Sequence, residues 1–78
     1  HREAKRLARS LARDILLYHR DKVERGLKEG NLPELIGEEI RKSWEFYKQK
    51  VPPDILQSTT YFKDALNEIL GKGKKIFV

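Results

Sequence analysis

The sequence has 78 residues, of which 38% are hydrophobic, and its 17 Lys and Arg against 12 Asp and Glu give a formal net charge of +5. A chain of this length is one domain or part of one. A domain this small buries only about 60% of its unfolded surface, so we expect marginal stability unless a partner or a second copy adds buried area. The absence of cysteine excludes disulfides, iron–sulfur clusters and cysteine-ligated zinc, and no apolar run reaches the roughly 18 residues of a membrane span.

The first predicted element is a long helix over residues 2–29. Apolar side chains recur in it every three or four residues, which is the spacing of a helical face. One apolar line consists of Ala4, Ala8, Leu11, Ile15 and Tyr18. A second consists of Ala12, Leu16, Val23 and Leu27. A helix with two apolar lines needs two neighbours, or one neighbour and a partner chain, and Gly30 suits the left-handed conformation of its C-terminus.

Two further helices are predicted, over residues 32–50 and 53–70. Asn31 and Glu34 have the spacing of a capping box at the start of the second helix. The Pro52–Pro53 pair must end that helix, because proline supplies no N–H and pushes the preceding residue out of the helical region. Residues 58–60 are the weak point of the third helix: we interpret them as an irregularity, and the alternative is a break with a new N-cap.

These elements predict an all-α fold, namely a three-helix bundle with a long first helix and antiparallel second and third helices. Residues 1–71 form the helical module and residues 72–78 a basic, flexible tail. The predicted core contains Leu11, Ile15, Trp44, Tyr47, Phe62 and Leu66.

Basic residues gather at both ends of the sequence, where they are candidate phosphate contacts. These candidates are Arg2, Arg6, Arg9, Arg13, Lys72, Lys74 and Lys75. A solvated helix face is the simpler interpretation of the arginines. Sequence-specific reading of DNA is not expected, because the third helix carries three acidic residues against Lys63 alone.

The sequence contains no constellation typical of an enzyme. It has no glycine-rich phosphate loop, nucleophile elbow or catalytic-triad spacing. His19 has no histidine or cysteine at helical spacing to complete a metal site. We therefore expect no catalysis, no cofactor and no bound metal. Phe46 lies off the apolar stripe of its helix, which makes it a candidate contact for a partner surface.

The sequence resembles a small helical module of bacterial multidomain proteins. The resemblance rests on Ala4–Arg9, Asp14–Ile15, Leu17–Tyr18, Lys22–Val23 and Gly26, then on Trp44–Tyr47, Val51–Pro52 and Tyr61–Leu66. It covers roughly residues 1–70. The resemblance implies a C-terminal module without enzymatic activity, found after zinc-ribbon or receiver-type domains, and a chain that starts at His1 fits a segment of a longer protein.

The sequence therefore predicts a non-catalytic interaction or self-association module of a larger bacterial cytoplasmic protein, with no membrane partner. The predicted protein contacts are Ala4, Ala8, Leu11, Ile15, Tyr18 and Phe46. The first predicted helix would be about 42 Å long and would project beyond the second and third helices, which would be about 27–29 Å long. We therefore expect a weak homodimer, or docking of a helix from another protein, through residues 4–18. The alternative is an accessory nucleic-acid-binding domain that uses the basic N-terminal helix and the C-terminal tail.

Overall fold

The computed structural model describes residues 1–77, which form six α-helices and one π-helical turn and contain no strand. The elements are α1 (Arg2–Tyr18), α2 (Arg20–Glu29), α3 (Leu32–Leu35), α4 (Gly37–Lys50), α5 (Pro53–Ser58), α6 (Tyr61–Ala65) and the π-helical turn η1 (Leu66–Leu70). The prediction of an all-helical fold is confirmed. Each of the three predicted helices, however, is divided into two.

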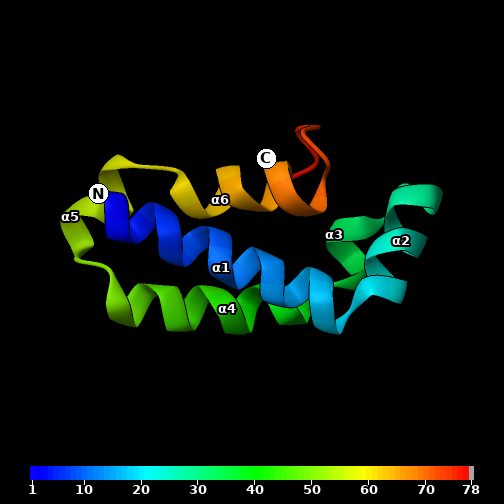
Figure 1. Ribbon diagram of the computed structural model, residues 1–78, viewed down its shortest axis with the longest axis horizontal. Coiled ribbons are helices and arrows are strands. Elements are labelled where there is room, and N and C mark those ends of the chain that lie inside the picture. The colour runs from blue at the N-terminus through cyan, green and yellow to red at the C-terminus, as the bar shows by residue number, and fades with distance from the viewer. Residues whose placement is uncertain (78) are drawn as a thin grey trace.

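The divisions fall at residues whose backbone leaves the helical region. His19 has φ −129° and ψ 37°, and the chain turns there so that α2 departs from the line of α1 (Figure 1). Ile36 separates α3 from α4 with φ −113° and ψ 17°. Thr59 and Thr60 separate α5 from α6, so the helix is broken there, with Thr60 at the N-cap position of α6, and is not continuous with an irregularity. The prediction of one continuous helix over residues 2–29 is therefore wrong, and so is the overhang expected from its length, because α1 ends at Tyr18.

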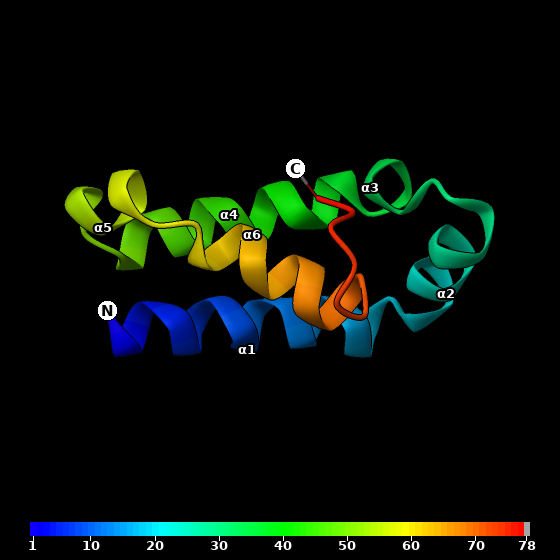
Figure 2. The ribbon, with the colours of Figure 1, turned by 90° about the horizontal axis from the view of Figure 1, so that it is seen from above.

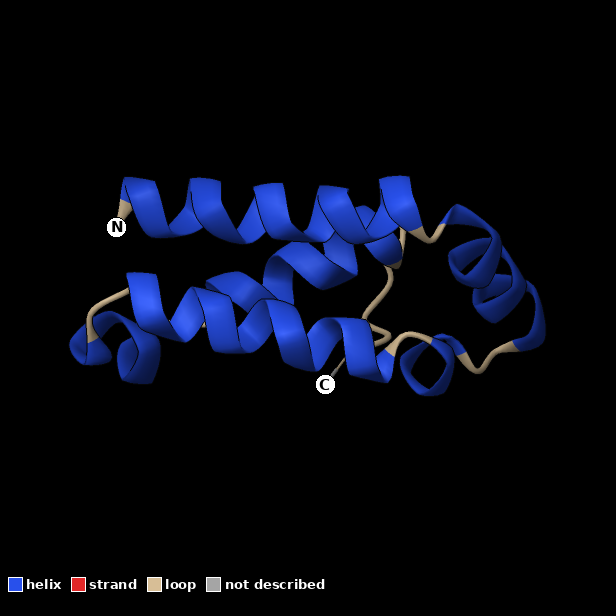
Figure 3. Cartoon of the chain, turned by 90° about the horizontal axis from the view of Figure 1, so that it is seen from below, coloured by secondary structure: helices blue, strands red, loops and turns tan. Residues whose placement is uncertain are grey.

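Helix α1 packs against α4 on one side and against α6 and η1 on the other. Figure 2 shows α6 lying over the α1–α4 pair, and α1 and α6 running in the same direction. In the opposite view, Figure 3, α1 and α4 lie in front, and no described helix covers this side of the pair. The α2–α3 unit closes one end of the molecule and α5 the other (Figure 1).

The core lies where α1, α4 and α6 meet. Tyr47 and Phe62 are buried, and with the partly buried Trp44 they form an aromatic cluster whose ring centroids are 5.3 to 5.7 Å apart. Of the other predicted core residues, Ile15 and Leu66 are buried, and Leu11 is partly buried and packs against the hydrophobic core. These core predictions are confirmed, with Trp44 and Leu11 at the edge.

The joint between α2 and α3 is unusually close. Gly30 takes the left-handed conformation with φ 78°, as its position predicts. The predicted capping box does not form, because the Oδ1 atom of Asn31 is buried without a hydrogen-bond partner in residues 1–77. Gly26 is buried, and a Cβ atom on it would lie 2.5 Å from the Cα atom of Leu32. The absence of a side chain at residue 26 therefore lets the two helices touch.

Residues 71–77 fold back over η1, and the flexibility expected of residues 72–78 stays a prediction. The side chain of Asn67 holds this segment: its Nδ2 donates to the carbonyl oxygen of Phe77 at 2.9 Å, and its Oδ1 accepts from the N–H of Phe77 at 2.6 Å. Ile76 and Phe77 are partly buried against the core. Val78, the last residue of the predicted tail, lies outside the described residues.

Candidate functional site

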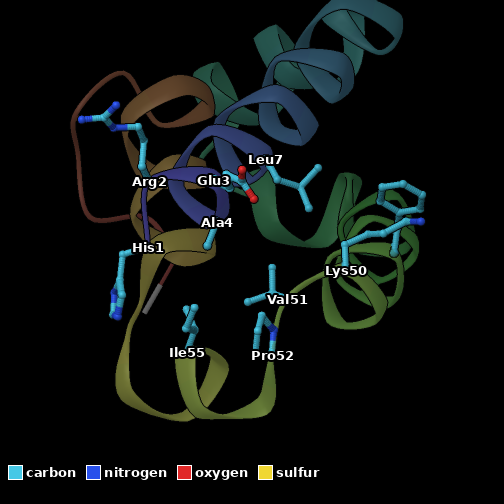
Figure 4. A pocket seen from close by; sticks show the side chains of 10 residues that line it. His1, Arg2, Glu3, Ala4, Leu7, Lys50, Val51, Pro52 and Ile55 are labelled. Atoms are coloured by element: carbon cyan, nitrogen blue, oxygen red, sulfur yellow. The ribbon is translucent and has the colours of Figure 1, made fainter.

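A cleft of about 760 Å³ opens at the end of the molecule where α1 begins and α4 ends. Its lining comes from the start of α1, the last turn of α4, the proline joint and α5 (Figure 4). The residues are His1, Arg2, Glu3, Ala4, Leu7, Phe46, Lys50, Val51, Pro52 and Ile55. We call this the junction cleft.

The junction cleft has apolar walls and a charged rim. Leu7 and Ile55 are partly buried, and Val51 is 5% exposed. Phe46 is 44% exposed, and the Nζ atom of Lys50 lies 5.6 Å from the centroid of its ring, within range of a cation–π interaction. The cleft therefore offers an accessible aromatic ring with a cation beside it.

The position of Phe46 agrees with the prediction that it is exposed, but most of the predicted apolar line does not form a free surface. Ala4, Ala8 and Ile15 are 5%, 0% and 4% exposed, because α4, α6 and η1 pack over this part of α1. Leu11 is partly buried, and only Tyr18 in this line is largely exposed, at 75%. The chain's own helices therefore occupy the docking surface predicted for residues 4–18.

The predicted phosphate contacts fall into three groups. Arg2, Arg6 and Arg13 are exposed and form no salt bridge within residues 1–77. Arg9 instead pairs with Glu68 of η1, with its Nη1 atom 2.8 Å from Oε1. The three lysines of the C-terminal segment, Lys72, Lys74 and Lys75, are exposed in the loop that follows η1.

A further charged cluster joins α2 to the start of α4. The Oε1 atom of Glu39 lies 3.2 Å from Lys22 Nζ and 3.9 Å from His19 Nδ1. The pKa of Glu39 is lowered, mainly because its own backbone N–H donates to the carboxylate and further because of Lys22, while desolvation acts in the opposite direction. The cluster therefore ties the turn at His19 to α4.

Sequence reasoning missed most of the junction cleft. Leu7 and Ile55 are far apart in the sequence, and no pattern in the sequence predicts that they line one cleft. The proline joint was recognised only as a helix end. The sequence contains one weak indication of the cleft: Leu7 lies off the apolar line formed by Ala4, Ala8 and Leu11, as Phe46 lies off the apolar stripe of its own helix.

The sequence matches no protein-family model, and neither a curated protein nor a solved structure is significantly similar to it. No group of three or more His, Cys, Asp or Glu side chains within residues 1–77 is placed to hold a metal ion. Among the helices of that range, none is both long and apolar enough to cross a membrane.

Proposed function

We propose that the chain is a non-catalytic helical interaction module that binds a short segment of another protein in the junction cleft. The observation that carries this proposal is a cleft with apolar walls, built from three elements, that has the half-exposed ring of Phe46 in its lining. A concave site that combines apolar side chains with a few polar groups is typical of a binding site. The volume of about 760 Å³ falls within the usual range of binding clefts.

The charges at the rim favour an acidic, amphipathic partner segment. Arg2 and Lys50 contribute two positive charges to the lining, against one negative charge from Glu3. A helical segment inserts its apolar side chains into such a groove at intervals of three and four residues. Carboxylates beside the apolar anchor would then face Arg2 and Lys50, which gives complementary charges across the interface.

The wider setting of the module is also part of the proposal. The resemblance to a C-terminal module supports a place in a larger bacterial cytoplasmic protein. Among the predicted contact residues, Tyr18 and Phe46 are exposed, at 75% and 44%. If the chain forms a homodimer, the interface would therefore contain one or both of these side chains.

The test uses the ¹⁵N-labelled chain and two synthetic helical peptides of about four turns. One peptide carries leucine on one face and glutamate on the other, and the second has lysine in place of glutamate. We expect the acidic peptide to shift the amide resonances of Leu7, Phe46 and Ile55, and the basic peptide to leave them in place.

Two variants that each remove an exposed aromatic ring give a matched comparison. Phe46→Ser should weaken binding of the acidic peptide about tenfold or more, as loss of a central aromatic contact does. Tyr18→Ser removes a ring that lies outside the cleft and should leave the affinity unchanged. Equal effects of the two substitutions, or an absence of shifts at the cleft, would contradict the proposal.

A further inference from the structure

Of the outer face of α1, the proposed function uses Arg2 alone. Arg2, Arg6 and Arg13 follow one another at intervals of four and seven residues, so they lie along one face of the helix. Ala4 and Ile15, which are 5% and 4% exposed, mark the opposite, buried face. We call Arg2, Arg6 and Arg13 the arginine row.

The chain does not neutralise this row. The three side chains are exposed and have no salt-bridge partner in the part of the chain that the structure describes, whereas Arg9 beside them pairs with Glu68. The helix macrodipole disfavours a cation in the first turn, so within the row it acts against Arg2 alone. Three neighbouring cations on one exposed face, none paired within the described residues, form a positive surface suited to an anionic partner.

We propose that the arginine row binds the phosphate backbone of a nucleic-acid duplex without reading its sequence. Residues 2 to 13 span about 16 Å of helix axis at 1.5 Å per residue, and a duplex presents about ten phosphate charges over that length. Arginine suits these ligands, because its planar guanidinium binds phosphate oxygens in pairs. The net charge of +5 adds a favourable long-range attraction.

The packing of α1 favours a duplex over a lipid surface. A helix that lies on a membrane inserts its apolar face between the lipids. The apolar face of α1 is already covered, since Ala12 is 0% and Ile15 is 4% exposed. Leu17 and Tyr18, which are 64% and 75% exposed, are adjacent at the end of α1 and do not form an apolar stripe along it.

The test measures binding of a fluorescent duplex of about two turns by anisotropy, between 50 and 200 mM salt. The variant is Arg6→Gln/Arg13→Gln, and Arg2 stays unchanged because it also lines the junction cleft. The matched control is Arg20→Gln/Arg25→Gln, which removes the same charge from exposed positions on α2. Circular dichroism checks that both variants fold like the parent chain.

Each phosphate contact contributes about 0.9 to the slope of log K against log salt, so loss of two contacts should lower that slope by about 1.8. Over this fourfold range of salt, the parent chain should therefore lose about 12-fold more affinity than the row variant does. The control should keep the parent slope. Equal slopes for variant and control would overturn the proposal, and so would equally strong, row-dependent binding to polyglutamate or to phosphatidylserine vesicles.

Discussion

The close approach of α2 and α3 predicts that Gly26→Ala destabilises the fold, although alanine is the better helix former. At an exposed helical position the substitution would stabilise the chain by about 1 kcal/mol. Here the new Cβ atom would lie 2.5 Å from Leu32 Cα and 2.8 Å from Leu32 Cδ1. Carbon atoms in contact prefer roughly 3.5–4.0 Å, so the two helices must separate by about 1 Å.

Overpacking of this kind costs about 1–3 kcal/mol. The clash is with backbone, which cannot rotate away as a side chain can, and the separation also exposes Leu32, now 1% exposed. We therefore expect an overpacking cost in the upper part of that range, which exceeds the gain in helix propensity. The net loss in the free energy of unfolding should be about 1–2 kcal/mol. For 78 residues, the total stability is of the order of 4–12 kcal/mol, so the loss is measurable.

The assay is urea unfolding followed by the fluorescence of Trp44, the sole tryptophan, and by far-ultraviolet circular dichroism. Gly37→Ala is the matched control. Gly37 is the first residue of α4, and a Cβ atom there meets nothing within 4 Å. The control should be neutral or more stable by up to about 1 kcal/mol. If Gly26→Ala were as stable as Gly37→Ala, the reasoning from the α2–α3 contact would be refuted.

Two further predictions concern the charged joint and the C-terminal segment. The folded-state pKa of Glu39 lies below its ordinary value of 4.5, so its carboxylate stabilises the fold above that pH and the contribution is lost as pH falls through the folded value. The Glu39→Gln variant should therefore be less stable than Glu38→Gln at neutral pH, and its free energy of unfolding should fall less as the pH is lowered. If the free energies of unfolding of the two variants fell equally in acid, the Glu39 carboxylate would not stabilise the fold. Asn67→Ala removes both hydrogen bonds to Phe77, at a cost of about 1–3 kcal/mol. The Phe77 amide should then exchange its hydrogen much faster. Unchanged protection of this amide would show that Asn67 does not hold the C-terminal segment in place.

Helical content and most core positions could be predicted from the sequence, because the spacing of apolar residues reports which face of a helix is covered. Gly30 and Pro53 were also recognisable, since each has a backbone preference that marks one end of a helix. The turns at His19 and Ile36 were not. Each is a single residue outside the helical region, and the apolar spacing resumes beyond it, so the pattern looks continuous.

The candidate site was predicted only where one residue departed from its own helix pattern. Phe46 was recognised in this way, whereas Leu7 and Ile55 meet only through the tertiary fold. The Ala4–Ala8 line was assigned to an outside partner for a related reason. Apolar spacing shows that a face is covered but not by what, and the cover is supplied within the chain by packing of α4, α6 and η1 on α1.

The pairing of α1 with α6 has a consequence for synthesis on the ribosome. The buried face of α1 is complete once residue 15 is made, but the helices that cover it end at residue 70. At about 5–20 residues per second, the first helix waits roughly 3–11 s for its last neighbour. Ala4, Ala8 and Ala12 expose little apolar side-chain surface during that delay. A leucine-rich face would fill more volume in the finished bundle, yet it would expose the nascent chain to aggregation before the bundle can close.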